Sequence, residues 1–200
     1  NLCSLENKIS KKELNFCTFT DKNTSFTKSY YGPLSKTNVI KNSYHLKKHH
    51  IITGPNAAGK TTILKSTLFN ILLSQQIGGG YYSKAKINMY HYLHCYLNIP
   101  DTSGRDSLFQ AEARRCKEIL DKIENSKAKR HFCIFDEIYS GTNPYDATNS
   151  AHQFLSYLTK YNTINFILTT HYVDLCDRLK NNKKIKNSNM KIIKTNNDIK

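Results

Sequence analysis

Short apolar runs alternate with longer amphipathic stretches over most of the chain. The runs HHIIT at 49–53, FCIF at 132–135 and INFILTT at 164–170 have the continuous apolar character of buried parallel strands. Other stretches repeat apolar residues three or four positions apart, which predicts helices at 60–75, 107–125, 147–160 and 172–179. Strands that alternate with helices predict an α/β fold with a mostly parallel central sheet flanked by helices.

The pattern near the N-terminus is weaker and predicts a small β subdomain. Residues 2–12 have the spacing of a short helix, and strand-like alternation follows at 15–20 and 39–46. In YYGPL at 30–34, a proline follows a glycine, which predicts a turn. Later in the chain, the three glycines at 78–80 are expected to end the first long helix. One more strand is predicted at 87–99, ending before Pro100.

Charge is distributed unevenly along the 200 residues, which carry a formal net charge of +15. Residues 1–50 hold nine basic and three acidic side chains, and residues 178–200 hold eight and one. Residues 51–177, by contrast, hold thirteen and eleven. One interpretation is a basic surface near nucleic acid. The other is that Lys, Asn and Ile are over-used throughout, since arginines and aromatic residues are not interleaved as in a base-stacking platform.

The compartment and the metal content can also be addressed from composition. The sequence has no run of eighteen apolar residues and no leader-like start, so it supports neither a membrane span nor a signal peptide. Its six cysteines form no C-x-x-C pair, which favours an intracellular protein, whether in a nucleus, an organelle or a viral factory. His91, His94 and Cys95 are close together, but strand alternation places the two histidines on opposite faces, which favours a plain strand over a metal site.

The stretch TGPNAAGKTT at 53–62 has the chemistry of a phosphate-binding loop. It matches G-x-x-x-x-G-K-[ST] with a predicted strand before it and a helix after it. Backbone amides of such a loop turn toward phosphate oxygens, Lys60 supplies a positive charge, and Thr61 offers its hydroxyl to Mg²⁺. We expect ATP to be bound by Gly54, Pro55, Asn56, Ala57, Ala58, Gly59, Lys60, Thr61 and Thr62.

Two further strand ends carry polar side chains that suit ATP hydrolysis. Asp136 and Glu137 follow the FCIF run, where Asp136 is expected to hold Mg²⁺ and Glu137 to polarise the attacking water. His171 follows the INFILTT run, in the position expected of a γ-phosphate sensor. A phosphate loop, an Asp-Glu pair and a terminal His, in this order, indicate the ABC-type branch of the P-loop ATPases.

The chain resembles the ATPase domain of the MutS family of mismatch-repair proteins. That family has T-G-P-N-x-x-G-K-[ST]-T, matched at 53–62, and S-x-F-x-x-E, matched by Ser107, Phe109 and Glu112. Its D-E-x-x-x-G-T is matched from Asp136 to Thr142, and its T-H-Y/F at 170–172. An L-S-G-G-Q-like string, expected of a transporter motor, is lacking before the Asp-Glu pair.

The resemblance implies a homodimer or heterodimer with two composite ATP sites. Ser107 would contact the γ-phosphate bound by the partner, although a serine before a helix is also an ordinary N-cap. Asn56 would help to place the hydrolytic water, and Val39 and Ile40 would border the adenine. ATP and Mg²⁺ are the implied ligands. The resemblance also implies mismatched or branched DNA as a partner, bound through domains outside this chain, and no membrane.

The resemblance divides the chain into three parts. Residues 1–30 would end a preceding lever or connector, residues 31–180 would form the ATPase domain, and residues 181–200 would lead to a dimerising helix-turn-helix. Ala57 and Ala58 depart from the family pattern, because Ala58 takes a place where a more permissive glycine is usual. Alternative interpretations are another ABC-type ATPase, such as a condensin-like DNA motor or a transporter motor, and a nucleotide-dependent dimer switch.

Overall fold

A five-stranded sheet forms the centre of the protein. The computed structural model describes residues 2–11, 13–35, 39–97 and 107–192. The strands of the central sheet lie in the order β11-β5-β10-β9-β8, and every neighbouring pair is parallel. Their bounds are β5 His49–Thr53, β8 Tyr92–Tyr96, β9 His131–Asp136, β10 Ile164–Thr169 and β11 Ile185–Asn189. The predicted α/β fold with a parallel central sheet is therefore confirmed.

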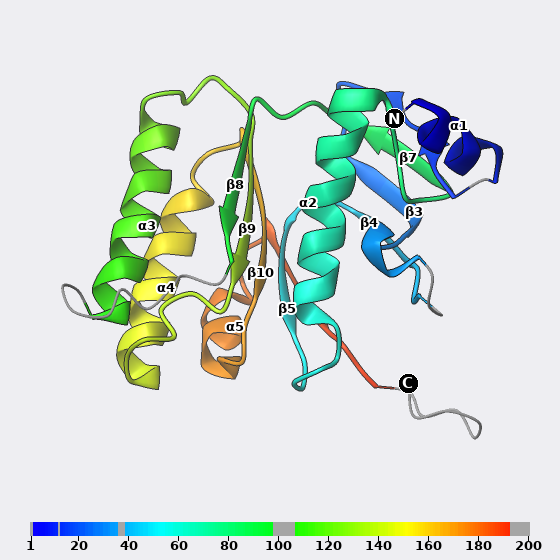
Figure 1. Cartoon of the computed structure of the whole chain (residues 1–200). Helices are drawn as coiled ribbons and strands as arrows, with labels where there is room; N and C mark the ends of the chain where they lie inside the picture. The colour runs from blue at the N-terminus through cyan, green and yellow to red at the C-terminus, as the bar shows by residue number, and fades with distance from the viewer. Residues whose placement is uncertain (1, 12, 36–38, 98–106, 193–200) are drawn as a thin grey trace.

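Helices cover both faces of this sheet (Figure 1). Helix α2, Lys60–Ile77, lies on one face, while three helices lie on the other: α3 Leu108–Glu124, α4 Pro144–Leu158 and α5 Val173–Leu179. All three begin at a residue other than the predicted one, and α3 differs by one residue only. Helix α4 starts three residues earlier, since the side chain of Asn143 accepts from the Asp146 amide and Pro144 fits the first turn. Helix α5 starts at Val173, after Tyr172.

The alternation of side chains along β9 divides the interior into two hydrophobic cores. Cys133 and Phe135 point toward α3, α4 and α5, whereas Phe132 and Ile134 pack against α2. All four are fully buried. Burial of each large side chain stabilises the fold by about 1.5–3 kcal/mol, which explains why this strand has no polar residue between His131 and Asp136.

A second, smaller sheet lies beyond α2, in agreement with the predicted β subdomain. Its order is β2-β7-β3-β4, and a separate pair of short strands, β1 and β6, lies beside it. The elements of this region are α1 Leu2–Ser10, β1 Asn15–Phe16, β2 Thr18–Phe19, β3 Ser25–Ser29, the 3-10 helix Gly32–Leu34, β4 Asn42–His45, β6 Gly79–Gly80 and β7 Lys84–Ile87. Gly78, with φ of +72°, ends α2 as the glycine run predicted.

The single strand predicted at 87–99 is wrong, because the chain crosses here from one sheet to the other. Strand β7 ends at Ile87 in the small sheet, and β8 begins at Tyr92 in the central one. Asn88 holds the crossing, since its side-chain amide donates to the carbonyls of Asp21 and Lys22 and its backbone amide donates to Thr24. Residues 98–99 of the predicted strand lie outside the described part of the chain.

A buried asparagine joins α2 to the small sheet. Asn70 is fully buried on α2, and its amide group donates to Ser29 Oγ at 3.1 Å and to the Tyr30 carbonyl at 3.0 Å. Its carbonyl oxygen accepts from the Tyr81 amide at 2.7 Å. Because a buried amide is costly unless it is bonded, this network specifies how the subdomain docks on the helix.

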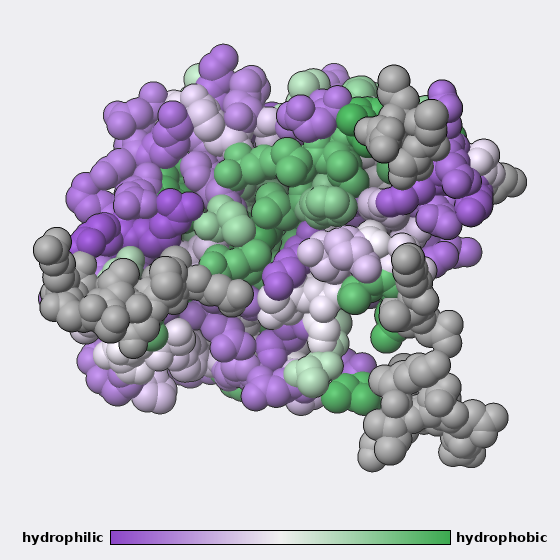
Figure 2. Space-filling model, in the orientation of Figure 1, coloured by the Kyte–Doolittle hydropathy of each residue, from purple (hydrophilic) through white to green (hydrophobic). Residues whose placement is uncertain are grey.

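Part of the sheet face beside α2 remains apolar at the surface (Figure 2). The view shows an apolar area between α3 and α2, bordered by hydrophilic residues. Leu72 and Ile77 on α2 are 42% and 40% exposed. Within the described residues, no helix is both long enough and apolar enough to cross a membrane.

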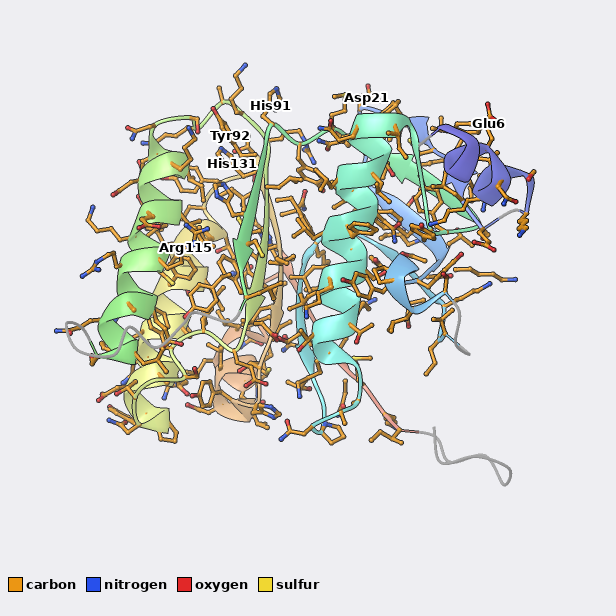
Figure 3. The ribbon with its side chains drawn as sticks, viewed as in Figure 1. Glu6, Asp21, His91, Tyr92, Arg115 and His131 are labelled. Carbon is orange, nitrogen blue, oxygen red and sulfur yellow. The ribbon has the colours of Figure 1, made fainter. Side chains whose placement is uncertain are left out.

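A pair of buried histidines lies near the amino ends of β8 and β9. His94 Nε2 is 3.0 Å from His131 Nδ1, and His131 Nε2 is 3.1 Å from the Ser126 carbonyl oxygen. A carbonyl only accepts, so His131 Nε2 carries a hydrogen, and in the neutral pair His94 Nε2 then donates to His131 Nδ1. Tyr92 stacks on His131, close to it in Figure 3. His94 faces this partner, and the described residues contain no group of three or more His, Cys, Asp or Glu side chains placed to hold one metal ion.

We predict that the protein loses stability as the pH falls from 6.5 toward 4. Burial, and next the neighbouring His131, lowers the pKa of His94 to about 4, and burial lowers the pKa of His49 to about 4 as well. Between these values and 6.5 the unfolded chain binds protons that the native chain does not, so the free energy of unfolding falls by up to about 1.4 kcal/mol per pH unit for each histidine.

Urea unfolding between pH 4.5 and 7 measures this slope. His94→Gln keeps a donor for His131 and removes one titrating group, so its free energy of unfolding should depend less steeply on pH. An equal slope in both proteins would contradict the assignment of His94 as neutral in the native state.

Candidate functional site

The loop between β5 and α2 bends through left-handed backbone conformations. The φ angles are +152° at Gly54, +60° at Ala57 and +89° at Gly59. Gly59 is the N-cap of α2 and offers no side-chain cap, so the first amides of α2 stay available to an acceptor outside the helix. From the sequence we expected Ala58 to occupy the position where the backbone favours glycine. The residue with the left-handed conformation is instead Ala57, and this conformation costs an alanine about 1 kcal/mol relative to glycine.

Lys60 lies at the centre of the site, buried under the loop. Its Nζ donates to the carbonyl oxygens of Gly54 at 2.9 Å and Pro55 at 3.2 Å, and lies 3.2 Å from His171 Nε2. His171 Nε2 is also 2.7 Å from Glu137 Oε1. One ring nitrogen cannot both donate to Glu137 and accept from Lys60, so His171 Nε2 makes only one of these two hydrogen bonds at a time.

A hydroxyl and a carboxylate meet one residue beyond the lysine. Thr61 Oγ1 donates to Asp136 Oδ2 at 2.9 Å, and the Thr169 hydroxyl donates to Asp136 Oδ1. Two of these oxygens, from Thr61 and Asp136, come from the first turn of α2 and the end of β9. Hard oxygen donors of this kind are the ligands that Mg²⁺ prefers, so the residues present fit the predicted metal.

The turn after β9 is strained and held by hydrogen bonds. Glu137 and Tyr139 have positive φ angles of +52° and +59°, which non-glycine residues rarely adopt. The Glu137 amide donates to the Thr169 carbonyl at 3.0 Å. Farther along, the buried carboxylate of Glu112 accepts from the Ser140 amide and hydroxyl and from the Gly141 amide, each at 3.0 Å. Glu112 therefore fastens this turn to α3.

A pocket of about 250 Å³ opens between these groups. Its lining includes Thr61, Asp136 and Glu137 on one side and Tyr96, Glu112 and Ser140 on the other. The Tyr96 hydroxyl is buried, and burial, with Glu112 as the next cause, raises its pKa. This pocket gives water access to the side chain of Glu137 directly beside the Thr61–Asp136 pair.

Ser107 is the N-cap of α3. Its Oγ accepts from the Gln110 amide at 3.3 Å, and the Gln110 side chain accepts from the Ser107 amide at 2.9 Å. Ser107 therefore acts as an ordinary helix N-cap, the alternative role that was open from the sequence. The side chain is exposed, and its hydroxyl hydrogen has no acceptor among the described residues. Gly141 packs against the same helix end, because a Cβ there would lie 2.7 Å from the Phe109 nitrogen.

A second pocket, of about 220 Å³, lies on the other side of the loop. Val39 and Ile40 line it, as do Ala57 and Thr62, so the structure brings these predicted residues together. Met190 was not predicted, since no motif includes it; its backbone amide donates to the Thr53 carbonyl, and it lines the same pocket. Tyr31 and Leu34, from the YYGPL turn, line it too and were not predicted. Asn56 is exposed and lines neither pocket.

Comparison with known proteins shows which family the sequence matches. Residues 50–200 match the family model of MutS domain V. The chain belongs to the MutS family. It is 31% identical over 163 residues to the DNA mismatch repair protein MutS of Persephonella marina. The aligned residues make up 80% of this chain and 18% of that protein.

Other relatives show the same coverage. The DNA mismatch repair protein MutS of Bacteroides fragilis is 30% identical over 152 residues, 74% of this chain and 17% of its own length. That of Borrelia garinii is 31% identical over 157 residues, 76% of this chain and 17% of its own. The chain thus spans less than a fifth of the length of the curated MutS proteins that it matches.

We predict that Glu112→Ala destabilises this MutS-family chain by at least about 2 kcal/mol, because three donors from Ser140 and Gly141 would lose a buried charged acceptor. Glu118→Ala is the matched control on the same helix. Its carboxylate forms an exposed pair with Arg115, so the change should stay within about 0.5 kcal/mol. Urea unfolding of both variants provides the comparison, and equal losses would refute the role of Glu112.

Proposed function

We propose that this MutS-family chain is a P-loop ATPase domain of the ABC type that binds ATP with Mg²⁺ and hydrolyses it. The observation that carries the proposal is the meeting of Lys60, the Thr61–Asp136 pair and the Glu137–His171 pair at the ends of three neighbouring strands. Few arrangements other than phosphoryl transfer use a lysine, a hydroxyl–carboxylate pair and an acid–imidazole pair around one phosphate-binding loop.

Binding of the triphosphate would use the loop and the start of α2. Uncapped amides of α2 and the helix dipole attract the negative charge, and the Lys60 ammonium would exchange the carbonyls of Gly54 and Pro55 for phosphate oxygens. The adenine would lie in the pocket lined by Val39, Ile40 and Tyr31. Its apolar and aromatic lining on one side of the loop favours this assignment over the polar pocket on the other.

Thr61 and Asp136 would hold Mg²⁺, which supplies a positive charge that stabilises the negative charge of the transferred phosphoryl group. Thr169 would keep the carboxylate of Asp136 oriented, since its hydroxyl donates to the second oxygen. Glu137 would accept a proton from the attacking water. His171 would position Glu137 through the 2.7 Å contact and would sense the γ-phosphate. We also assign Asn56 to the placement of the water.

The active unit that we propose is a homodimer or a heterodimer with composite sites. Ser107, with its exposed hydroxyl at the positive end of α3, suits a negative group presented by a second chain. In the longer protein, nucleotide state would then be coupled to mismatched or branched DNA bound by other domains. The relatives described above are all DNA mismatch repair proteins, which supports this assignment.

We predict that Glu137→Ala lowers ATP turnover by about 100-fold or more, because the general base is removed. ATP affinity should stay within about threefold, since Glu137 binds no part of the nucleotide in the ground state. Phosphate release and titration with a fluorescent ATP analogue give the two values. Lys60→Ala is the contrasting variant and should lose binding itself. If wild type and Glu137→Ala bind ATP and turn it over equally slowly, the chain is a nucleotide-dependent dimer switch rather than an ATPase.

We also predict that two inactive variants complement each other. Mixed Lys60→Ala and Ser107→Ala chains form dimers in which one site has both an intact loop and an intact partner serine. Random pairing then restores about a quarter of the wild-type turnover. The measurement is ATPase activity against total concentration, with dimer formation followed by sedimentation. Activity no higher than the sum of the two separate variants, in a sample shown to be dimeric, would exclude the contact between subunits.

A further inference from the structure

The amino end of the central sheet carries another pocket, at the edge opposite the candidate ATP site. Its volume is about 250 Å³. Apart from Asn23, its lining comes from the residues at or just before the starts of β5, β9, β10 and β11. Five of its lining side chains are cationic: Lys47, Lys48, Arg130, Lys183 and Lys184. None of the lining residues is acidic.

The parallel register explains why these cations converge. Ile185 at the start of β11 pairs with His49 at the start of β5, so the lysines just before each strand become neighbours. The His49 amide donates to the Lys184 carbonyl at 2.9 Å and fixes this approach. On the other side, Ile164 of β10 pairs with His131 of β9, which places Arg130 at the same edge.

These cations differ from several on the helices that have acidic partners. Arg115 pairs with Glu118 and Lys117 with Asp121 along α3. Among the described residues, the side chains of Lys47, Lys48 and Lys183 have neither an ion pair nor a hydrogen bond. Lys184 donates only to neutral acceptors, the Thr159 carbonyl at 2.7 Å and Asn162 Oδ1 at 2.9 Å. The positive charge of the pocket is thus not neutralised by carboxylates.

Side chains in the deeper part of the pocket are held in place by contacts with their neighbours. Asn165 accepts from Arg130 Nη2 at 3.2 Å and donates to the Leu46 carbonyl at 3.1 Å. Arg130 also lies over the ring of Tyr90, 4.9 Å from its centroid. Its Nε is buried without a partner in the described protein. Burial, and next Lys184, lowers the pKa of His49, which agrees with a positive potential here.

We infer that this amino-edge pocket binds phosphate groups. Lysine ammonium groups act as point charges for phosphate, and several of them around one concave surface neutralise a charge that no protein carboxylate satisfies. Such groups belong either to the backbone of a nucleic acid or to a free polyphosphate. The inference is independent of ATP hydrolysis, since the two pockets lie at opposite ends of the strands and share no lining residue.

The test neutralises the three lysines that have no partner. Lys47→Gln, Lys48→Gln and Lys183→Gln are combined, because these exposed side chains make no contact on which folding depends. The matched control combines Lys11→Gln, Lys84→Gln and Lys117→Gln, which removes the same charge from exposed positions outside the pocket. Circular dichroism melting checks both proteins, and the pair Lys47→Gln, Lys48→Gln serves if the pocket triple does not fold.

Binding of a labelled DNA duplex of about 30 base pairs is measured by fluorescence anisotropy without nucleotide, from about 50 to 200 mM salt. The pocket triple should bind at least about tenfold more weakly than wild type, and its salt slope should shrink by about 2.7, or 0.9 for each lost phosphate contact. The control triple should change affinity by less than about threefold. Equal weakening in both triples would show a non-specific charge effect and would overturn the inference for a nucleic acid.

Calorimetry with inorganic tripolyphosphate identifies the source of the phosphate. The pocket would be assigned to a free polyphosphate if wild type and the control triple show a heat of binding that the pocket triple lacks. DNA binding that depends on the pocket, without such a difference in heat, would assign it to a nucleic-acid backbone. If the pocket triple matches the control triple in both measurements, the pocket binds no phosphate.

Discussion

The parallel pairing of β10 with both β5 and β9 is the constraint on which the rest of the structure depends. It places Thr169 level with Ile52 on one side and with Asp136 on the other. The segments that follow these three residues therefore leave the sheet at one edge: the phosphate loop, the Asp-Glu turn and His171. A one-residue slip in either pairing would turn each side chain of β10 to the opposite face. It would separate Asp136 from the Thr169 hydroxyl and move Phe166 and Leu168 out of the core beneath α3, α4 and α5.

The same pairing explains why the two edges of the sheet differ in chemistry. At the carboxyl edge, β5, β9 and β10 are followed by turns that expose backbone amides and short polar side chains, and the positive ends of α2, α4 and α5 point there. At the amino edge, β9, β10 and β11 receive the chain from the C-terminal ends of α3, α4 and α5, where lysine and arginine are favoured by the helix dipole. The clustering of Lys47, Lys48, Lys183 and Lys184 at that edge goes beyond this tendency, because no carboxylate accompanies them.

Much of the fold could be predicted because its signals are local. HHIIT gave the bounds of β5, and the apolar spacing after Lys60 gave nearly the full length of α2. The prediction of a single strand at 87–99 failed because a continuous run of β-forming residues does not indicate which sheet each part of it joins. That choice depends on Asn88 bonding to the loop at 21–24, a contact between segments distant in sequence.

In the candidate site, too, local motifs were predicted and contacts between distant segments were not. Lys60, Thr61, Asp136, Glu137 and His171 were predicted from motifs, and the structure brings them together. The supports were not predicted: Thr169 under Asp136 and Met190 beside the loop lie outside the quoted motifs. Glu112 was part of the S-x-F-x-x-E match, but its bonds to the 140–141 turn were not predicted. Motifs report residues whose type is dictated by the ligand, whereas Thr169 and Met190 act through contacts that other residue types at other places could make.

The support from Glu112 also connects the two parts of the proposed composite site. Glu137 and Tyr139 take backbone conformations that cost about 1–3 kcal/mol each, so the turn keeps this shape only if its surroundings hold it. Glu112 bonds the far end of that turn, and it belongs to the first two turns of α3, whose N-cap is Ser107. Gly141 packs directly on the same helix end. Few flexible residues therefore separate the Glu137 turn from Ser107, the group proposed to contact the partner's nucleotide. A displacement of this turn within one chain would shift Ser107 with it.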